Sequence, residues 1–315
     1  MEYIILLVSL LGIVYGADYL VAGSVSIARK FRVSDFVIGA AIVGVGTSMP
    51  ELVVSFLGAL KGNSDVAIGN IVGSNIFNIL GILGITSMLF PIKITRKNLS
   101  FEIPVCIGVS SLPALLVFNP LSNGRFVISR FDGIMLLLCF ALYMWYSFHR
   151  DRRHMKDAEI DVETDNMPLL LSIIAVLGGL AALIISCDVF VDNAVNIAKS
   201  FGVSDSFISL TLIACGTSLP ELAASIAAAR KKNTQLALGN IIGSNIFNIT
   251  WILGLSAQVM PLNSSDITMV DYGVMIAAAA VPAVLGIKGK INRLAGFLMF
   301  ISFVAYTAYL LLVQM

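Results

Sequence analysis

Two glutamates have near-identical surroundings in the two halves of the sequence. Glu51 ends the run Gly-Thr-Ser-Met-Pro-Glu at 46–51, and Glu221 ends the run Gly-Thr-Ser-Leu-Pro-Glu at 216–221. In each run a threonine precedes the glutamate by four residues, so on a helix its hydroxyl shares a face with the carboxylate. The hydroxyl residues of the two runs are Thr47, Ser48, Thr217 and Ser218. Carboxylate and hydroxyl oxygens are ligands for a hard cation.

Each run also contains a proline that opens the helix. Pro50 has no N–H to donate to the carbonyl of Gly46, and Pro220 has the same effect on the carbonyl of Gly216. A carbonyl freed inside an apolar segment needs another partner, and a bound ion can provide one.

A second polar motif follows each glutamate. Gly-Asn-Ile-Val-Gly-Ser-Asn-Ile-Phe-Asn at 69–78 recurs, with one conservative change, at 239–248. Its first Asn, its Ser and its last Asn are spaced i, i+4, i+8, which places them on one stripe of a helix. The candidate ligands of this motif are Ser74, Asn78, Ser244 and Asn248. The other amides could bind ions or join helices by hydrogen bonds; they are Asn70, Asn75, Asn240 and Asn245.

The segments that carry these motifs are apolar enough to lie in a membrane. Hydrophobic residues make up 58% of the 315 residues and charged residues 12%, against about 25% charged in soluble domains. A membrane-crossing helix needs about 20 apolar residues. Ten such segments are predicted at 3–25, 35–60, 66–90, 101–119, 128–148, 168–190, 205–229, 235–260, 268–287 and 293–313.

Positive charges fix the predicted orientation. With ten spans, alternate loops starting from the first hold sixteen of the twenty Lys and Arg residues. The positive-inside rule places these loops in the cytoplasm and both termini outside. The four on the opposite side are Lys61, Arg125, Arg130 and Lys199.

The chain is an internal duplication. Residues 18–84 align without a gap to residues 188–254, and 34 of 67 positions are identical. Each half has five spans, so the second half enters the membrane inverted, as in many secondary transporters. The predicted fold class is an all-α polytopic membrane protein of two inverted five-helix repeats. The repeats are 1–148 and 168–315, joined by a cytoplasmic linker at 149–167.

The charges of the two glutamates require compensation. Each is expected near the middle of a span, where an ionised group costs at least about 2.5–3.5 kcal/mol, and no Lys or Arg occupies the middle of any span. A metal cation or a proton is the remaining counter-charge. Two carboxylates are neutralised equally by one Ca2+ or two Na+, which makes competition between these ions a basis for exchange. A third repeated acid pair, Asp18 and Asp188, lies toward span ends, and its role in ion access or as solvated carboxylates stays open.

At these motifs the chain resembles the Ca2+/cation antiporter superfamily, in particular the prokaryotic Na+/Ca2+ exchangers. The two motif pairs look like the α-repeats of that family. The resemblance implies metal ligands from side chains and from backbone carbonyls. The side chains are those of Thr47, Ser48, Glu51, Ser74, Asn78, Thr217, Ser218, Glu221, Ser244 and Asn248, and the carbonyls lie near Gly44 and Ala214.

The resemblance also implies a mechanism and a location. Several Na+ move against one Ca2+ by alternating access, so transport is electrogenic, with spans 1 and 6 moving as a gating pair against the other eight. Some relatives carry Asp at the position of Asn248, which is associated with K+ co-transport, so this chain is expected not to need K+. The short linker leaves no room for a regulatory Ca2+-sensing domain. We therefore expect a protein of a prokaryotic cytoplasmic membrane that functions as a monomer.

Other functions account for these residues less well. A Ca2+/H+ antiporter is the nearest alternative, because the glutamates could carry protons. A channel is less consistent with an inverted two-fold site. An intramembrane hydrolase that depends on histidine is not expected, because both histidines, His149 and His154, lie in the linker region. The chain is thus predicted to be no enzyme, with Ca2+ and Na+ as transported ions, no cofactor, no nucleic-acid partner and the lipid bilayer as its environment. The four cysteines are expected to be free thiols in apolar segments.

Overall fold

The computed structural model describes residues 2–117, 127–155, 167–200, 214–263 and 267–314. These residues are almost entirely helical. Four two-residue strands form two antiparallel pairs: β1 (Ile92–Lys93) with β4 (Lys290–Ile291), and β2 (Val127–Ile128) with β3 (Leu262–Asn263). Ile92 lies opposite Ile291, and Val127 lies opposite Asn263.

The chain divides into two compact units, each with residues from both halves of the sequence. The first unit comprises Met1–Pro50 and Tyr143–Asn240, and the second comprises Glu51–Leu142 and Ile241–Met315. The compact units therefore differ from the sequence repeats. The repeat boundaries at 1–148, 149–167 and 168–315 stay a prediction, and most of the linker lies outside the described residues.

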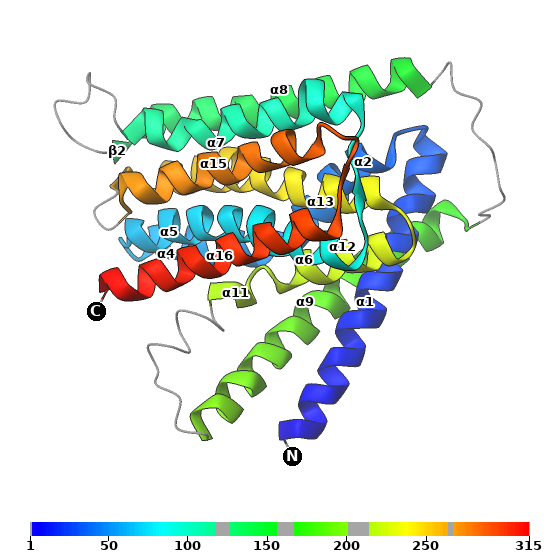
Figure 1. Ribbon diagram of the computed structural model, residues 1–315, viewed down its shortest axis with the longest axis horizontal. Coiled ribbons are helices and arrows are strands. Elements are labelled where there is room, and N and C mark those ends of the chain that lie inside the picture. The colour runs from blue at the N-terminus through cyan, green and yellow to red at the C-terminus, as the bar shows by residue number, and fades with distance from the viewer. Residues whose placement is uncertain (1, 118–126, 156–166, 201–213, 264–266, 315) are drawn as a thin grey trace. The chain divides into compact units, whose positions relative to one another are not determined.

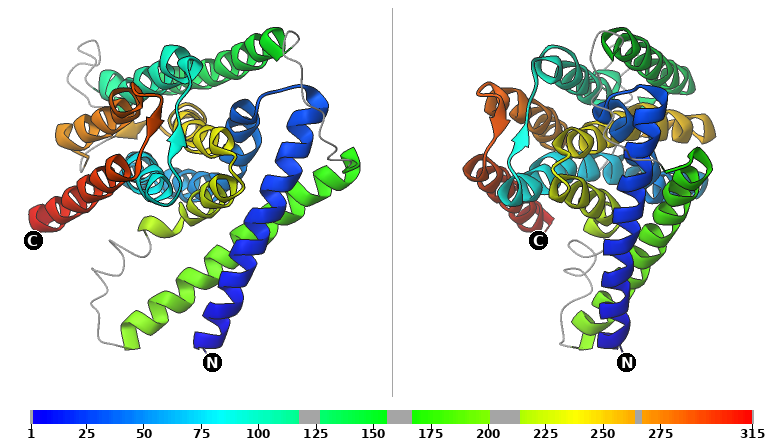
Figure 2. Two further views of the ribbon diagram at one scale, coloured as in Figure 1. Left: turned by 45° about the vertical axis from the view of Figure 1, so that its right-hand side comes forward. Right: turned by 90° about the vertical axis from the view of Figure 1, so that its right-hand side faces the viewer.

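The first unit is organised around two long helices that lie side by side, α1 (Glu2–Phe31) and α9 (Leu169–Ser200) (Figures 1 and 2). Glycines allow this approach: a Cβ on Gly16 would lie 2.7 Å from the backbone nitrogen of Leu183, and one on Gly179 would lie 2.6 Å from that of Leu20. Its remaining helical segments are α2 (Asp35–Ile38), η1 (Gly39–Gly44), α3 (Val45–Thr47), α11 (Ala214–Gly216), α12 (Leu219–Arg230) and the first half of α13 (Thr234–Phe247).

The second unit packs α15 (Met269–Gly286) against α7 (Ile103–Val117), and α16 (Arg293–Gln314) against α6 (Gly84–Leu89) (Figure 1). Its other helical segments are α4 (Met49–Leu60), α5 (Ser64–Ile76), η2 (Phe77–Leu83), η3 (Asn98–Glu102), the first half of α8 (Arg130–Met155), the second half of α13, η6 (Asn248–Ile252) and α14 (Leu253–Val259). Helices α4, α8 and α13 each run from one unit into the other along the chain.

The helix interruptions recur in both halves. Ser48 (φ −81°, ψ 10°) stands before α4 and Ser218 (φ −94°, ψ 8°) before α12, and both have left the helical conformation. A proline stands two residues further on in each case, where its missing N–H makes a helix start favourable. The axis bends by 50° between Asp35–Thr47 and Met49–Leu60. Duplicated sequence therefore produces duplicated breaks.

The predicted spans agree with the helices of the described residues. Eight helices there are long and apolar enough to cross a membrane, and the bent pair Asp35–Thr47 with Met49–Leu60 is a ninth. Each of the nine coincides with one predicted span. The tenth prediction, 205–229, begins in residues that lie outside the described part, and its remainder contains α11 and α12.

Candidate functional site

In the first unit, Glu221 lies in the first turn of α12 with none of its surface exposed. The hydroxyl of Ser48 donates a hydrogen bond of 2.8 Å to the Oε1 of Glu221. Ser48 is itself fully buried. A candidate ligand of the first sequence repeat thus touches the carboxylate of the second, although 173 residues separate them.

Asn240 connects this carboxylate segment to Thr47. Its side-chain nitrogen donates to the backbone carbonyl of Glu221 at 3.1 Å and to the hydroxyl of Ser225 at 2.8 Å. Its Oδ1 accepts a hydrogen bond of 3.2 Å from the hydroxyl of Thr47. The carbonyl oxygen of Gly44 accepts from the backbone N–H of Ser48 at 3.1 Å and lies 3.4 Å from the Thr47 hydroxyl. Asn240 therefore positions α12 and Thr47 relative to each other.

The second unit contains the matching arrangement around Glu51, which is also 0% exposed. Asn70 donates to the backbone carbonyl of Glu51 at 3.3 Å and to the hydroxyl of Ser55 at 2.9 Å. These contacts reproduce those of Asn240. Ser55 and Ser225 were not among the predicted ligands, although they correspond at the repeat offset and each follows its glutamate by four residues.

Four asparagines of the second unit join the end of α5 and the start of η2 to the end of α13 and the start of η6. The side chain of Asn75 donates to the backbone oxygen of Asn245 at 3.2 Å, and Asn245 returns a bond of 3.1 Å to the backbone oxygen of Asn75. Asn78 donates to Oδ1 of Asn245, and Asn248 to Oδ1 of Asn75, both at 3.0 Å. The amide nitrogen of each of the four side chains of this square thus donates a hydrogen bond to a protein acceptor.

Acceptor oxygens remain at the edge of the square. Within the described residues, the Oδ1 atoms of Asn78 and Asn248 and the Oγ of Ser74 are buried and have no hydrogen-bond partner. Leaving a buried polar atom unsatisfied costs about 1–3 kcal/mol, so such atoms call for a ligand. All three are oxygens, which suits Ca2+ or Na+ better than a soft metal. The same holds for the buried hydroxyl of Thr217 in the first unit.

Of the remaining candidates, Ser218 and Ser244 are fully buried, and Ala214 opens α11. The described residues contain no group of three His, Cys, Asp or Glu side chains arranged to hold a metal. The structure therefore divides the predicted ligands between the first unit and the second. Thr47, Ser48, Thr217, Ser218 and Glu221 belong to the first, and Glu51, Ser74, Asn78, Ser244 and Asn248 belong to the second.

Comparison with known proteins gives consistent matches along the whole chain. A putative antiporter CaxA of Alkalimonas amylolytica is 37% identical and covers 94% of each chain. The sodium/calcium exchanger MaX1 of Methanosarcina acetivorans is 32% identical over 95% of each. A structure of the sodium-calcium exchanger NCX_Mj soaked without Na+ and Ca2+ superposes with a TM-score of 0.84 at 31% identity, covering 98% of each chain.

These matches identify the architecture and the family. The predicted fold class, an all-α polytopic membrane protein of ten helices in two inverted five-helix repeats, is confirmed by the structural match. The sodium/calcium exchanger protein family matches residues 1–149 and 171–312, which include both glutamate motifs and both asparagine motifs. The resemblance inferred from those motifs is therefore confirmed, and the chain belongs to the sodium/calcium exchanger protein family.

Proposed function

We propose that this protein is a secondary antiporter that exchanges Na+ for Ca2+ by alternating access, with net movement of charge. Its family is one of sodium/calcium exchangers, and a relative of nearly the same length carries that name. The two ions are transported substrates rather than cofactors. The protein is accordingly a transporter and no enzyme.

We further propose that the cations bind to the oxygens of the two buried clusters. The ligands are Thr47, Ser48, Glu51, Ser74, Asn78, Thr217, Ser218, Glu221, Ser244 and Asn248, with backbone carbonyls near Gly44 and Ala214. The observation that carries this proposal is the set of buried, unsatisfied acceptors on Ser74, Asn78 and Asn248 beside a network in which the amide nitrogens of Asn78 and Asn248 donate to other side chains. Oxygens arranged in this way attract cations and repel anions.

The two carboxylates account for the exchange. Ca2+ takes six to eight oxygen ligands in flexible geometry, which carboxylate, hydroxyl and amide oxygens provide. One Ca2+ or two Na+ compensate the charges of Glu51 and Glu221 equally. Binding one ion type therefore removes the electrostatic reason to bind the other, and the two compete. The exchange is electrogenic when more than two Na+ move against each Ca2+, because the two sets of charges then no longer cancel.

The packing of α1 on α9 supports a movement of these two helices as a gating pair. Their backbones come together at Gly16 and Gly179, and the hydroxyls of Ser26 and Ser172 are hydrogen-bonded at 2.8 Å. Backbone-to-backbone contact leaves little space for sliding between the helices. We propose that α1 and α9 move as one body to alternate access.

The location is proposed from the distribution of charge. Sixteen of the twenty Lys and Arg residues fall in the loops assigned to the cytoplasm. We place both termini outside, in the cytoplasmic membrane of a prokaryote. We also propose that a monomer is functional, because both glutamate motifs are present in one chain.

The test is uptake of 45Ca2+ into proteoliposomes. Vesicles loaded with Na+ are compared with vesicles loaded with choline that carry an outward proton gradient. The proposal expects uptake that requires internal Na+ and that a K+ ionophore modulates through the membrane potential. Uptake that is driven by protons and indifferent to Na+ would overturn Na+ coupling and favour a Ca2+/H+ antiporter. Uptake without either gradient would indicate a channel.

A further inference from the structure

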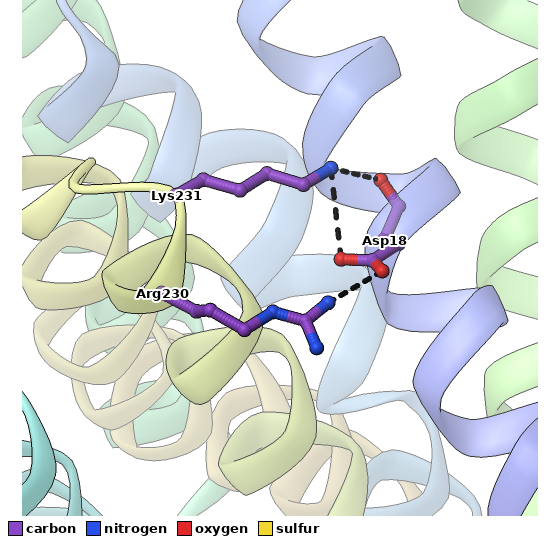
Figure 3. A network of polar contacts seen from close by, with 3 residues as sticks. All are labelled: Asp18, Arg230 and Lys231. Atoms are coloured by element: carbon purple, nitrogen blue, oxygen red, sulfur yellow. Dashed lines mark hydrogen bonds and ion pairs between the residues drawn. The ribbon is translucent and has the colours of Figure 1, made fainter.

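A cluster of three charged side chains ties α1 to the end of α12 within the first unit (Figure 3). Nη2 of Arg230 donates to Oδ2 of Asp18 at 2.5 Å. Nζ of Lys231 lies 3.6 Å from the other carboxylate oxygen and donates to the backbone oxygen of Asp18 at 2.9 Å. One carboxylate thus holds two cationic side chains, both from the C-terminal end of α12.

This tie is absent from the sequence repeat. At the repeat offset Asp18 corresponds to Asp188 and Lys231 to Lys61, but Arg230 corresponds to Leu60. The strongest contact of the cluster can therefore form in only one half of the molecule. A contact that stabilised the fold generally would have been useful in both copies, so the one-sided occurrence points to a role that distinguishes two states.

Beside the cluster, the face between α1 and α12 is apolar and incompletely filled. A groove of about 260 Å3 is lined by Leu10, Val14 and Ala17 of α1 and by Leu219, Ala223 and Ala227 of α12, with Arg230 at its edge. The side chains of Asp18, Lys231 and Arg230 are 27%, 39% and 50% exposed. A partly exposed ion pair contributes little, typically about 0.2–1 kcal/mol, and can open and close readily.

We propose that Asp18, Arg230 and Lys231 form a latch that holds the α1–α9 pair against α12 in one access state and releases it in the other. This inference rests on the alternating-access function proposed above. The loop that contains Arg230 and Lys231 is assigned to the cytoplasm by its charge, so the latch closes the cytoplasmic side. Asp18 is a positioning residue, because it acts on helix position and its polar side-chain contacts within the described residues are with Arg230 and Lys231.

The direct test is a cross-link between helices that must separate. In a chain whose four native cysteines are replaced by alanine, Asp18→Cys with Arg230→Cys is joined by a cleavable bis-maleimide in proteoliposomes. We expect Na+-dependent Ca2+ uptake to fall at least about tenfold, because the alternating step is blocked, and to return on cleavage. The matched control joins Ser26→Cys to Ser172→Cys, which ties α1 to α9; uptake should stay within about twofold because these helices move together.

Full transport by the cross-linked Asp18–Arg230 pair would overturn the latch. Equal loss of uptake from both cross-links would also overturn it, because transport would then require α1 to move relative to α9 as much as relative to α12. If the unlinked protein shows no Na+-dependent uptake, the proposed exchange itself is wrong, and the latch is then decided by a measurement that needs no transport.

That measurement is hydrogen exchange in the purified protein. Asp18→Asn should speed exchange at the end of α12 and in the adjoining loop by about two- to fivefold, the range that corresponds to an exposed ion pair. Asp18→Glu should restore protection, and Lys232→Gln, which removes a neighbouring charge of the same loop, should leave it unchanged. Unaltered exchange in Asp18→Asn, or equal acceleration by Lys232→Gln, contradicts the latch.

Discussion

The two copies of the duplicated motif share one class of contact and differ in another. Asn70 and Asn240 make the same pair of bonds, each to its glutamate backbone and to a serine four residues beyond that glutamate. Asn75 and Asn245 exchange reciprocal bonds of 3.2 and 3.1 Å. Both copies of the motif make these contacts, so the contacts can hold in every access state.

The other class belongs to one copy. Thr47 bonds to Asn240 and to the carbonyl of Val43 at 2.9 Å, whereas the hydroxyl of Thr217 has no hydrogen-bond partner in the described part of the chain. Asp18 holds Arg230, whereas the sequence position that corresponds to Arg230 in the first repeat is occupied by Leu60. Inverted repeats exchange their conformations when access alternates. One-sided contacts are therefore the ones expected to report or select the state, and shared contacts the ones expected to hold the scaffold.

The largest effect should come from the carboxylates. Glu51→Gln and Glu221→Gln each remove half of the negative charge proposed to compensate the ions, and Gln keeps nearly the same volume. We expect either change to lower Na+-dependent Ca2+ uptake at least about 100-fold. The reason is that the lost attraction between a carboxylate and a cation in a buried site amounts to about several kcal/mol. Folding is checked by size-exclusion elution and thermal unfolding in detergent. Wild-type transport by either variant would show that the buried glutamates are no ligands.

A smaller, symmetric effect is expected from the asparagine square. Asn75→Ala and Asn245→Ala each delete one donated and one accepted hydrogen bond. Each change leaves buried partners unsatisfied, which costs about 1–3 kcal/mol. Because the bonds are reciprocal, the two variants should lose equal stability. The two changes remove different bonds, because the reciprocal bonds are accepted by backbone oxygens that alanine keeps. The double variant should therefore lose about the sum of the two single losses, and a departure from that sum measures the coupling between these neighbours. Thermal unfolding measures the stability of all three variants. Strongly unequal losses of stability in the two single variants would show that Asn75 and Asn245 are not equivalent.

Much of this arrangement was predictable from the sequence, for identifiable reasons. Length and apolarity identify membrane helices in a sequence, and each of the nine spans in the described residues coincides with a prediction. The burial of Glu51 and Glu221 was expected from their places within the predicted spans 35–60 and 205–229. The breaks before α4 and α12 follow from Pro50 and Pro220, which no helix interior accommodates freely.

What the sequence left open depends on which helices meet. The contact of Ser48 with Glu221 joins residues that are far apart in the chain, and no local pattern predicts it. Asn70, Asn75, Asn240 and Asn245 had two possible roles, and the structure places their amide groups in hydrogen bonds between helical segments. The ion pair of Asp18 was unpredictable for the same reason, because its partners lie at the end of a helix from the other repeat. The compact units were also unexpected, since each mixes residues from both repeats.

An unequal effect should separate the two threonines. Thr47→Val removes a hydroxyl that bonds to Val43 and Asn240, at nearly constant volume, and should lower stability by about 1 kcal/mol. Thr217→Val removes a hydroxyl with no hydrogen bond in the described residues and should cost less than half as much. Both changes should weaken ion binding, because both hydroxyls are proposed ligands. Equal losses of stability, measured by thermal unfolding without ions, would show that the hydrogen bonds of Thr47 do not distinguish the two copies of the motif.

The smallest effect is expected from a change at Asp188, the counterpart of Asp18 at the repeat offset. Asp188 is exposed on α9, whereas Asp18 is two-thirds or more covered and holds two cations. Substitutions at exposed sites usually change stability by no more than about 0.5 kcal/mol, so Asp188→Asn should leave thermal unfolding unchanged in the state that the structure represents. Its hydrogen-exchange pattern at the end of α12 should match that of the unmodified protein, in contrast to Asp18→Asn. Acceleration of equal size by both variants would mean that the two acids act alike, and the distinction between shared and one-sided contacts would then fail at the position where it is most specific.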